Sequence, residues 1–207
     1  IIGLAVSWGV KRGIYSNEAG QGTGPHASSA ASVSHPAKQG LVQAFSVYVD
    51  TLLVCSATAF MILITGSYNV VGPDNAPMFI GLKDVATGPA YTQAAVEGLM
   101  PGFGQAFVAI ALFFFAFTTI LSYYYISETN VSYINRKLHR PFLFFILKLF
   151  VMGSCIFGAV KTADLAWAVG DIGVGLMAWL NIIAILLLNK KAFLCLRDYE
   201  KQLAIGL

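Results

Sequence analysis

The sequence predicts an all-α integral membrane protein, and two observations carry that prediction. Apolar residues make up 57 % of the 207 residues and charged residues only 11 %, whereas soluble domains usually carry about 25 % charged residues. The charges are also missing from whole stretches, since no Asp, Glu, Lys or Arg lies between Glu97 and Glu128. A helix needs about 20 apolar residues to cross a bilayer. Membrane strands are not expected, because no two-residue alternation persists.

Five apolar segments are predicted to be membrane helices. Residues 1–10 look like the tail of a span that begins before Ile1, so we expect a fragment of a longer protein. The complete spans are predicted at 41–64, 103–125, 142–160 and 165–188. We expect 1–207 to form one transmembrane domain, ending in an amphipathic tail at 190–207 that suits a helix on the inner leaflet.

The basic residues of the connecting segments predict the topology. Counted in chain order over 11–40, 67–102, 128–141, 161–164 and the tail, Lys and Arg number three, one, three, one and four. Basic loops face the cytoplasm, so the tail is predicted to be cytoplasmic and 67–102 to be an extracellular loop of the lid type. The three histidines, His26, His35 and His139, fall in the inner segments, where solvated side chains are expected.

Several other protein classes do not fit this sequence. The net charge of +3 comes from scattered residues, so no nucleic-acid partner is expected. Three cysteines form no CxxC pair, which argues against a zinc site or a disulfide framework. Nor does a nucleophile–base pattern appear, so we expect neither an enzyme nor an organic cofactor.

The segment 12–32 is the most unusual part of the chain. It holds Arg12, Ser16, Asn17, Glu18, Gln21, Thr23 and His26 among glycines beside a span. Its glycines and Pro25 make a continuous helix unfavourable. Broken polar backbone near membrane depth is tolerated where it is buried in protein or lines a cavity, and such breaks occur near transporter ion and substrate sites. An ordinary cytoplasmic turn is the alternative.

Hydroxyls and acids inside the spans are further candidates. Thr118 and Thr119 are adjacent, and Tyr123 lies four residues after Thr119, on the same helical face. Such hydroxyls suit an alkali cation, although a threonine in a membrane helix often bonds its own backbone. Asp50 and Asp171 lie within predicted spans, where ionisable residues line cavities or pair with opposite charges.

Four segments together resemble one family, the alanine or glycine:cation symporters, also called sodium:alanine symporters. They are GVKRGIYSNEAGQGTGPHASSAA at 9–31, HPAKQGLVQ at 35–43, FAFTTILSYYYISE at 115–128 and DIGVGLMAWLNIIAILLL at 171–188. They follow the order of the family motifs over nearly the whole chain.

The resemblance implies a leucine-transporter-type bundle of inverted repeats. This chain would hold the end of helix six and helices seven to ten, and the first half of the fold would complete the sites.

The resemblance also implies site residues. Thr118 and Thr119 match the hydroxyl pair that completes a sodium site, with the carbonyl of Phe115 as a third ligand. Tyr123, where many relatives have tryptophan, would bound the substrate pocket together with Thr119. The polar residues after the first span match an inner gate; they are Arg12, Ser16, Asn17 and Glu18.

The function implied by this resemblance is sodium-coupled symport of alanine or glycine across the cell membrane by alternating access. The coupling ion would be Na⁺ and the partners the amino acid, sodium and the lipid bilayer. A proton-coupled carrier of the same fold remains open, as does a channel or a non-transporting membrane subunit.

Overall fold

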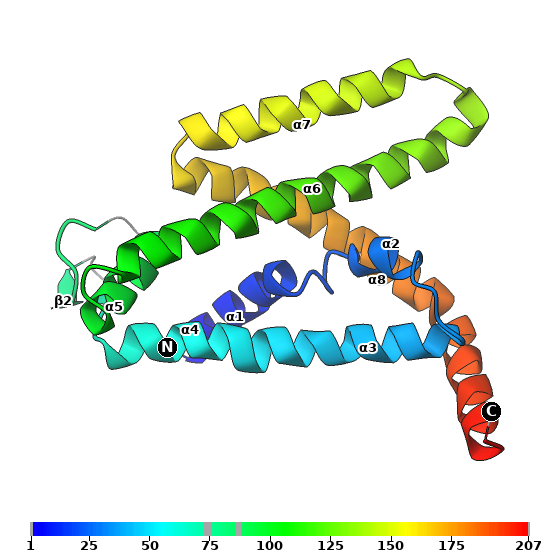
Figure 1. Ribbon diagram of the computed structural model, residues 1–207, viewed down its shortest axis with the longest axis horizontal. Coiled ribbons are helices and arrows are strands. Elements are labelled where there is room, and N and C mark those ends of the chain that lie inside the picture. Colours follow the sequence, from blue (N-terminus) through cyan, green and yellow to red (C-terminus); the bar gives the residue numbers. More distant parts are fainter. Residues whose placement is uncertain (1, 73–75, 86–87, 207) are drawn as a thin grey trace. The chain divides into compact units, whose positions relative to one another are not determined.

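The computed structural model describes residues 2–72, 76–85 and 88–206, and it is mainly helical (Figure 1). The elements follow in chain order: α1 (Ile2–Ser16), α2 (Gly24–Ser28), α3 (Pro36–Tyr48), η1 (Val49–Cys55), α4 (Ser56–Ile64), β1 (Asn69–Val71), β2 (Pro77–Ile80), α5 (Pro89–Leu99), α6 (Gly104–Leu138), α7 (Phe142–Val160) and α8 (Ala163–Ala204). They form two compact units, one of Ile1–Thr51 with Tyr124–Leu207 and the other of Leu52–Tyr123, which are described separately.

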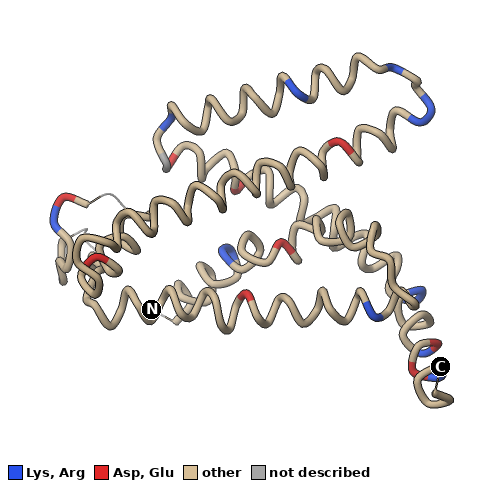
Figure 2. The backbone as a smooth tube through the Cα atoms, in the orientation of Figure 1, with Lys and Arg blue, Asp and Glu red and all other residues tan. Residues whose placement is uncertain are grey.

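Four helices among the described residues are long and apolar enough to cross a membrane. They are Pro36–Ile64, Gly104–Leu138, Phe142–Val160 and Asp164–Ala204. Figure 2 shows long uncharged stretches on these helices. Large apolar side chains such as Phe113, Trp179 and Leu186 are exposed on them. Exposed apolar surface of this kind requires an apolar surrounding, as expected for a protein in a bilayer.

The predicted span 165–188 and the predicted tail 190–207 belong to one helix in the structure. Helix α8 runs for 42 residues, which is about 60 Å at 1.5 Å per residue. No Gly or Pro interrupts it between 189 and 204, so the helical hydrogen bonds continue past the apolar stretch. Helix α6 likewise extends beyond the predicted 103–125 and ends at Leu138.

The first unit is organised around α8. Helices α1 and α3 both pack against it, and α2 packs against α3. The N-terminus of α3 illustrates how the sequence sets these ends. His35 is extended (φ −148°, ψ 135°), its Nδ1 accepts a hydrogen bond from the backbone N–H of Ala37 at 3.1 Å, and Pro36 occupies the first helical position. An acceptor side chain before the helix and proline at its first position both favour a helix start.

The expectation that His35 is solvated is wrong. Its side chain is buried, its ring stacks on Tyr199 at 5.2 Å between centroids, and its Nε2 lies 3.3 Å from Oδ2 of Asp198. His26 also has a partner, because its Nδ1 lies 3.3 Å from Oγ1 of Thr129. The solvated expectation failed because residues near the C-terminus of α8 lie beside the start of α3, which loop composition does not reveal.

The second unit contains the connection 67–102, which holds a hairpin and a helix. Strands β1 and β2 are antiparallel, with Asn69 opposite Ile80 and a bulge after Val70. The side chain of Asn69 bonds both the N–H and the C=O of Leu82, at 2.9 and 2.8 Å. Helix α5 packs against α4. The predicted lid is therefore folded over its described residues, since backbone groups of the hairpin pair with each other.

The turn between α5 and α6 is closed by Glu97. Its carboxylate accepts hydrogen bonds from the backbone N–H groups of Gly102 at 2.6 Å and Gln105 at 3.0 Å. Gln105 lies in the first turn of α6, where N–H groups lack helical partners, and Gly102 lies in the turn just before it. The two hydrogen bonds, that from Gly102 first, lower the pKa of Glu97 below its ordinary value.

Candidate functional site

The break after α1 is the centre of the candidate site. We call residues 17–23 the helix break; they separate α1 from α2. The side chain of Asn17 accepts a hydrogen bond from the N–H of Ala19 at 3.1 Å, and Glu18 has a left-handed backbone (φ 56°). The carboxylate of Glu18 also accepts a hydrogen bond from Oγ1 of Thr23, which is buried. Side-chain bonds of this kind compete with helical ones, so the expectation of a discontinuous helix is confirmed.

Helix α8 holds the helix break in place through Asn181. Its Nδ2 donates hydrogen bonds to the carbonyls of Ala19 at 2.9 Å and Gly20 at 3.2 Å. Gly22 lies against the same side chain with φ +75°, and a Cβ there would stand 2.5 Å from Oδ1 of Asn181. The close approach therefore requires glycine at this position, both for its backbone angle and for space.

The end of α1 and the helix break also contact η1. Oγ of Ser16 donates to Oδ2 of Asp50 at 2.6 Å, and Nδ2 of Asn17 donates to Oγ1 of Thr51 at 3.2 Å. Element η1 is a seven-residue π-helix, a conformation that occurs mainly as short insertions within α-helices and is frequent at functional sites. Two consecutive residues of the first segment thus meet two consecutive residues of the second.

A charged and aromatic cluster links α1 to α8. Asp171 forms an ion pair with Lys11 and accepts a hydrogen bond from the hydroxyl of Tyr15 at 2.7 Å. Lys11 was counted with an inner loop in the sequence analysis, yet its partner lies inside the predicted span 165–188. Pairing is how ionisable groups are accommodated at membrane depth.

Arg12 lies against three aromatic rings in the structure. Its guanidinium lies 4.3 Å from the ring centroid of Trp167, 5.3 Å from that of Trp8 and 5.7 Å from that of Tyr15. These distances are those of cation–π contacts. Among the described residues, the buried Nη1 of Arg12 has no hydrogen-bond partner.

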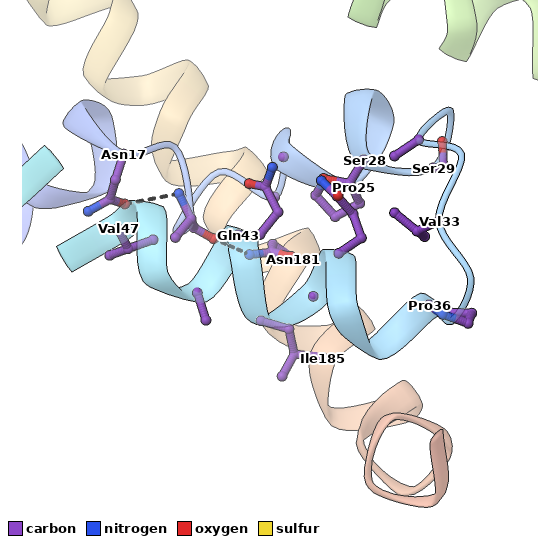
Figure 3. A pocket seen from close by; sticks show the side chains of 17 residues that line it. Asn17, Pro25, Ser28, Ser29, Val33, Pro36, Gln43, Val47, Asn181 and Ile185 are labelled. Atoms are coloured by element: carbon purple, nitrogen blue, oxygen red, sulfur yellow. Dashed lines mark hydrogen bonds between the residues drawn. The ribbon is translucent and has the colours of Figure 1, made fainter. Parts of the chain in front are cut away.

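A cavity of about 700 Å³ lies beside the helix break (Figure 3). Its polar lining includes the side chains of Asn17, Gln43 and Asn181, while Val47 and Ile185 supply apolar surface. Small residues of the helix break and α3, among them Gly22 and Gly40, leave the space open. The cavity therefore combines a mainly apolar wall with a few amide groups, as small-molecule sites do.

The predicted cation ligands lie on α6, in the second unit. Oγ1 of Thr118 donates to the carbonyls of Phe114 at 2.9 Å and Phe115 at 3.1 Å. Thr118, Thr119 and Phe115 are all exposed, while Tyr123 is half-buried. The hydroxyl of Thr118 thus already lies within hydrogen-bond distance of the predicted carbonyl ligand.

The residues predicted for the site therefore fall into two groups. Ser16, Asn17 and Glu18 lie at the helix break, and Arg12 lies one turn earlier in α1 beside Trp167. The α6 residues belong to the other unit. Sequence reasoning missed Asn181 and the contact of Asp50 with Ser16. An amide within an apolar span is the one signal that could have singled out Asn181.

Comparisons with known proteins identify relatives of the chain. A family model described as the sodium:alanine symporter family matches residues 1–207.

The YrbD protein of Bacillus subtilis (strain 168) is 62 % identical over the whole chain, which covers 43 % of that protein. The sodium/proton-dependent alanine carrier protein of Bacillus sp. (strain PS3) is 61 % identical over the whole chain, which covers 46 % of it. The sodium/alanine symporter AgcS of Methanococcus maripaludis is 37 % identical over 193 residues, 91 % of this chain and 38 % of that protein. No solved structure matches. The chain thus spans less than half the length of these relatives.

Proposed function

Because this chain belongs to the sodium:alanine symporter family, we propose that the full-length protein carries alanine or glycine into the cell together with Na⁺. The family and the four long apolar helices make the chain part of a multi-pass membrane protein. The observation that carries the proposal is the helix break, where polar side chains of α1, η1 and α8 meet between apolar helices. Discontinuous helices of this kind supply transporter binding sites.

The proposed architecture is a leucine-transporter-type bundle in the cell membrane. In it, α1 belongs to helix six, and the following spans are helices seven to ten. The C-terminus is cytoplasmic, as the basic residues of the tail and inner loops indicate. The helix break and its cavity then lie toward the inner side, where Arg12, Ser16, Asn17 and Glu18 act as an inner gate.

One sodium site is proposed on α6. Its ligands are the hydroxyls of Thr118 and Thr119 and the carbonyl of Phe115, completed by backbone from the missing half of the fold. The bond of 3.1 Å from Thr118 to the Phe115 carbonyl lies within α6 and is of the kind a membrane threonine commonly makes. The proposal therefore rests on the adjacent hydroxyls and on the family motif. Thr119 and Tyr123 also face the substrate pocket in this proposal.

Proton coupling is the second candidate, and a specific finding favours it. The Bacillus sp. (strain PS3) relative is named for both sodium and proton dependence. A carboxylate such as Asp50 can bind either cation, so the two candidates share chemistry and differ in the ion.

Uptake of labelled alanine by proteoliposomes containing the full-length protein tests the function. An inward sodium gradient should drive accumulation that glycine competes for, and choline in place of sodium should abolish it. Equal uptake in sodium and choline, lost when a proton gradient is collapsed, would assign proton coupling instead. No uptake under either gradient would refute amino-acid symport and favour a channel or a non-transporting subunit.

A further inference from the structure

We propose that Arg12 binds the carboxylate group of a small molecule, in a site that three aromatic rings form around its guanidinium. The rings belong to Trp8, Tyr15 and Trp167. The site lies between α1 and α8, which pack against each other in the same compact unit. The choice of alanine as the molecule that brings the carboxylate rests on the proposed function. The inference thereby assigns a ligand to one member of the proposed inner gate.

The charges of this cluster do not balance. Lys11 forms an ion pair with Oδ2 of Asp171, and Oδ1 of Asp171 accepts a hydrogen bond from Tyr15. The charge of Arg12 acts on Asp171 as well, yet Arg12 forms no ion pair or hydrogen bond with any residue that the structure describes. Two cations thus share one carboxylate whose oxygens both have donors, and one positive charge is left uncompensated.

The guanidinium of Arg12 also has a buried donor to satisfy. Its Nη1 is covered by protein atoms and lacks an acceptor within the described part of the chain. A buried donor without an acceptor costs free energy, especially when it is charged, and such groups are rare in folded proteins. The side chain as a whole is only half-buried, so part of it remains accessible. A ligand with acceptor oxygens would remove this cost.

A carboxylate is the acceptor that fits this guanidinium best. The N–H groups of arginine form a planar fork that matches the two oxygens of a carboxylate, and such bidentate bonds are among the strongest hydrogen bonds in proteins. Cation–π contacts engage the positive charge without consuming an N–H donor, so the fork stays available. The one uncompensated positive charge also matches the single negative charge of a carboxylate.

Helix α8 holds the aromatic walls of the site in place. The ring of Tyr15 meets that of Trp167 edge to face, with 5.4 Å between centroids and 78° between planes. The Tyr15 hydroxyl is fixed by its bond to Asp171, and it lies close to Gly170, where a Cβ would stand 3.2 Å from it. Groups that are already ordered lose less conformational freedom when a ligand binds.

The site adjoins the helix break. Arg12 lies four residues before the end of α1 at Ser16, which is about 6 Å along the helix axis. A positive charge at this place raises the local concentration of anionic groups. An amino acid held on Arg12 by its carboxylate would therefore lie beside the helix break and the cavity next to it.

Tryptophan fluorescence of the purified full-length protein, in buffer without sodium, measures binding, because Trp8 and Trp167 border the site. Alanine should change the fluorescence, as should propionate, which has the carboxylate but no ammonium group. Alaninamide, which lacks the carboxylate, should not. Arg12→Gln should weaken the binding of propionate and of alanine by about tenfold or more, because a charge-assisted pair is lost. Arg12→Lys keeps the charge but not the fork and should lose less.

Arg136→Gln is the matched control and should bind propionate as wild type. Arg136 belongs to the same unit and also contacts an aromatic ring, that of Tyr133 at 5.7 Å, but it is exposed.

A second measurement needs no variant, so it decides the question where Arg12→Gln does not fold. Phenylglyoxal modifies guanidinium groups, and mass spectrometry of the peptides gives the rate at each arginine. Propionate at four times its dissociation constant should slow modification of Arg12 about fivefold and leave that of Arg136 unchanged. Alaninamide should protect neither residue.

Three results would overturn the proposal. The first is folded Arg12→Gln protein with wild-type affinity for propionate. The second is equal protection of Arg12 by propionate and alaninamide, since the carboxylate would then not be what is recognised. The third is no protection of Arg12 at all; lower thermal stability of Arg12→Gln than of Arg136→Gln would in that case assign Arg12 to an acidic side chain of the full-length protein outside this chain. If propionate and alanine bind through Arg12 but alanine is not transported, the site stands and the proposed function is wrong.

Discussion

At the scale of single residues, short contacts around the helix break and the hydroxyls of α6 carry most of the functional argument. Gly22, Asn181 and Ser16 each have a role that depends on atoms from another segment of the chain. Gly22 is needed because Asn181 occupies the space beside it. Thr119, by contrast, is proposed on the strength of its hydroxyl alone.

Gly22→Ala should destabilise the protein by about 1–3 kcal/mol, because a left-handed backbone disfavours a side chain and the new Cβ would meet Asn181. Thermal unfolding of the full-length protein measures the change. Gly173→Ala on α8 is the control, since open space surrounds that position. There the higher helix propensity of alanine should leave stability equal or raised by up to about 1 kcal/mol. Equal effects at both positions would contradict the role given to Gly22.

Thr119→Ala should raise the sodium concentration for half-maximal alanine uptake by about tenfold, because one oxygen ligand is removed. Thr119→Ser keeps the hydroxyl and should restore the wild-type dependence. Thr58→Ala is the matched control in the same unit; its hydroxyl bonds the carbonyl of Val54 within its own helix. Unchanged sodium dependence in Thr119→Ala would remove this residue from the sodium site.

At the scale of elements, the ends of helices are where side chains replace missing backbone partners. His35 precedes α3 and accepts from Ala37, and Glu97 accepts from the N–H groups of Gly102, just before α6, and Gln105, in its first turn. A carboxylate loses its capping ability when it is protonated, so the turn between α5 and α6 responds to acid.

The lowered pKa of Glu97 predicts the direction of that response. A carboxylate whose pKa is lower in the folded state contributes stability above its unfolded pKa, which is about 4.3. The contribution is lost as the pH falls below that value and through the folded pKa. Glu97→Gln should therefore be less stable than wild type at neutral pH, and the difference should shrink as the pH falls below about 4.

Thermal unfolding of both proteins across this pH range measures the difference. Glu200→Gln, at an exposed position of α8, is the control and should follow wild type. A difference between Glu97→Gln and wild type that persists undiminished at the acid end would show that the carboxylate charge is not what holds the turn.

At the scale of the whole molecule, the unit that contains α8 is held by contacts between residues far apart in the sequence. In the unit that contains α8, Asp171 pairs with Lys11, Asn181 bonds Ala19, and Asp198 contacts His35. These three contacts follow one another along α8 in the same order as their partners follow in the chain. Helix α8 therefore supports α1, the helix break and the start of α3 in turn.

Substitution of His35 should release the C-terminal part of α8. His35→Ala loses both the helix cap and the contact with Asp198 and should cost about 0.5–2 kcal/mol for the cap alone. His35→Asn keeps an acceptor for the cap but is too short to reach Asp198, so its loss of stability should be smaller. Both variants should speed tryptic cleavage at Arg197 and Lys201, because the stacked ring no longer holds this segment.

Ser46→Ala is the control for these variants, since its hydroxyl bonds Gln43 within α3. Limited proteolysis of the full-length protein, followed by mass spectrometry of the fragments, gives the cleavage rates. If His35→Asn is cleaved at the wild-type rate, the contact with Asp198 does not hold the tail.

The sequence by itself determined the all-α membrane class, the break after the first span and the family, because each depends on local composition or on a contiguous motif. Runs of apolar residues specify membrane helices without reference to their neighbours, and glycine and side-chain bonding break a helix locally. The matching of GVKRGIYSNEAG to a family motif is likewise independent of the fold. The polar residues around the break could therefore be singled out before the structure.

Only the tertiary structure decided which of these residues meet. The contact of Ser16 with Asp50, the pairing of Lys11 with Asp171 and the contact of His35 with Asp198 each join residues 34 to 163 positions apart. No periodicity or composition encodes such a contact, because its free energy comes from two helices packing side by side. Asn181 shows this most clearly: a single amide in an apolar run has meaning only once the carbonyls of Ala19 and Gly20 are seen beside it.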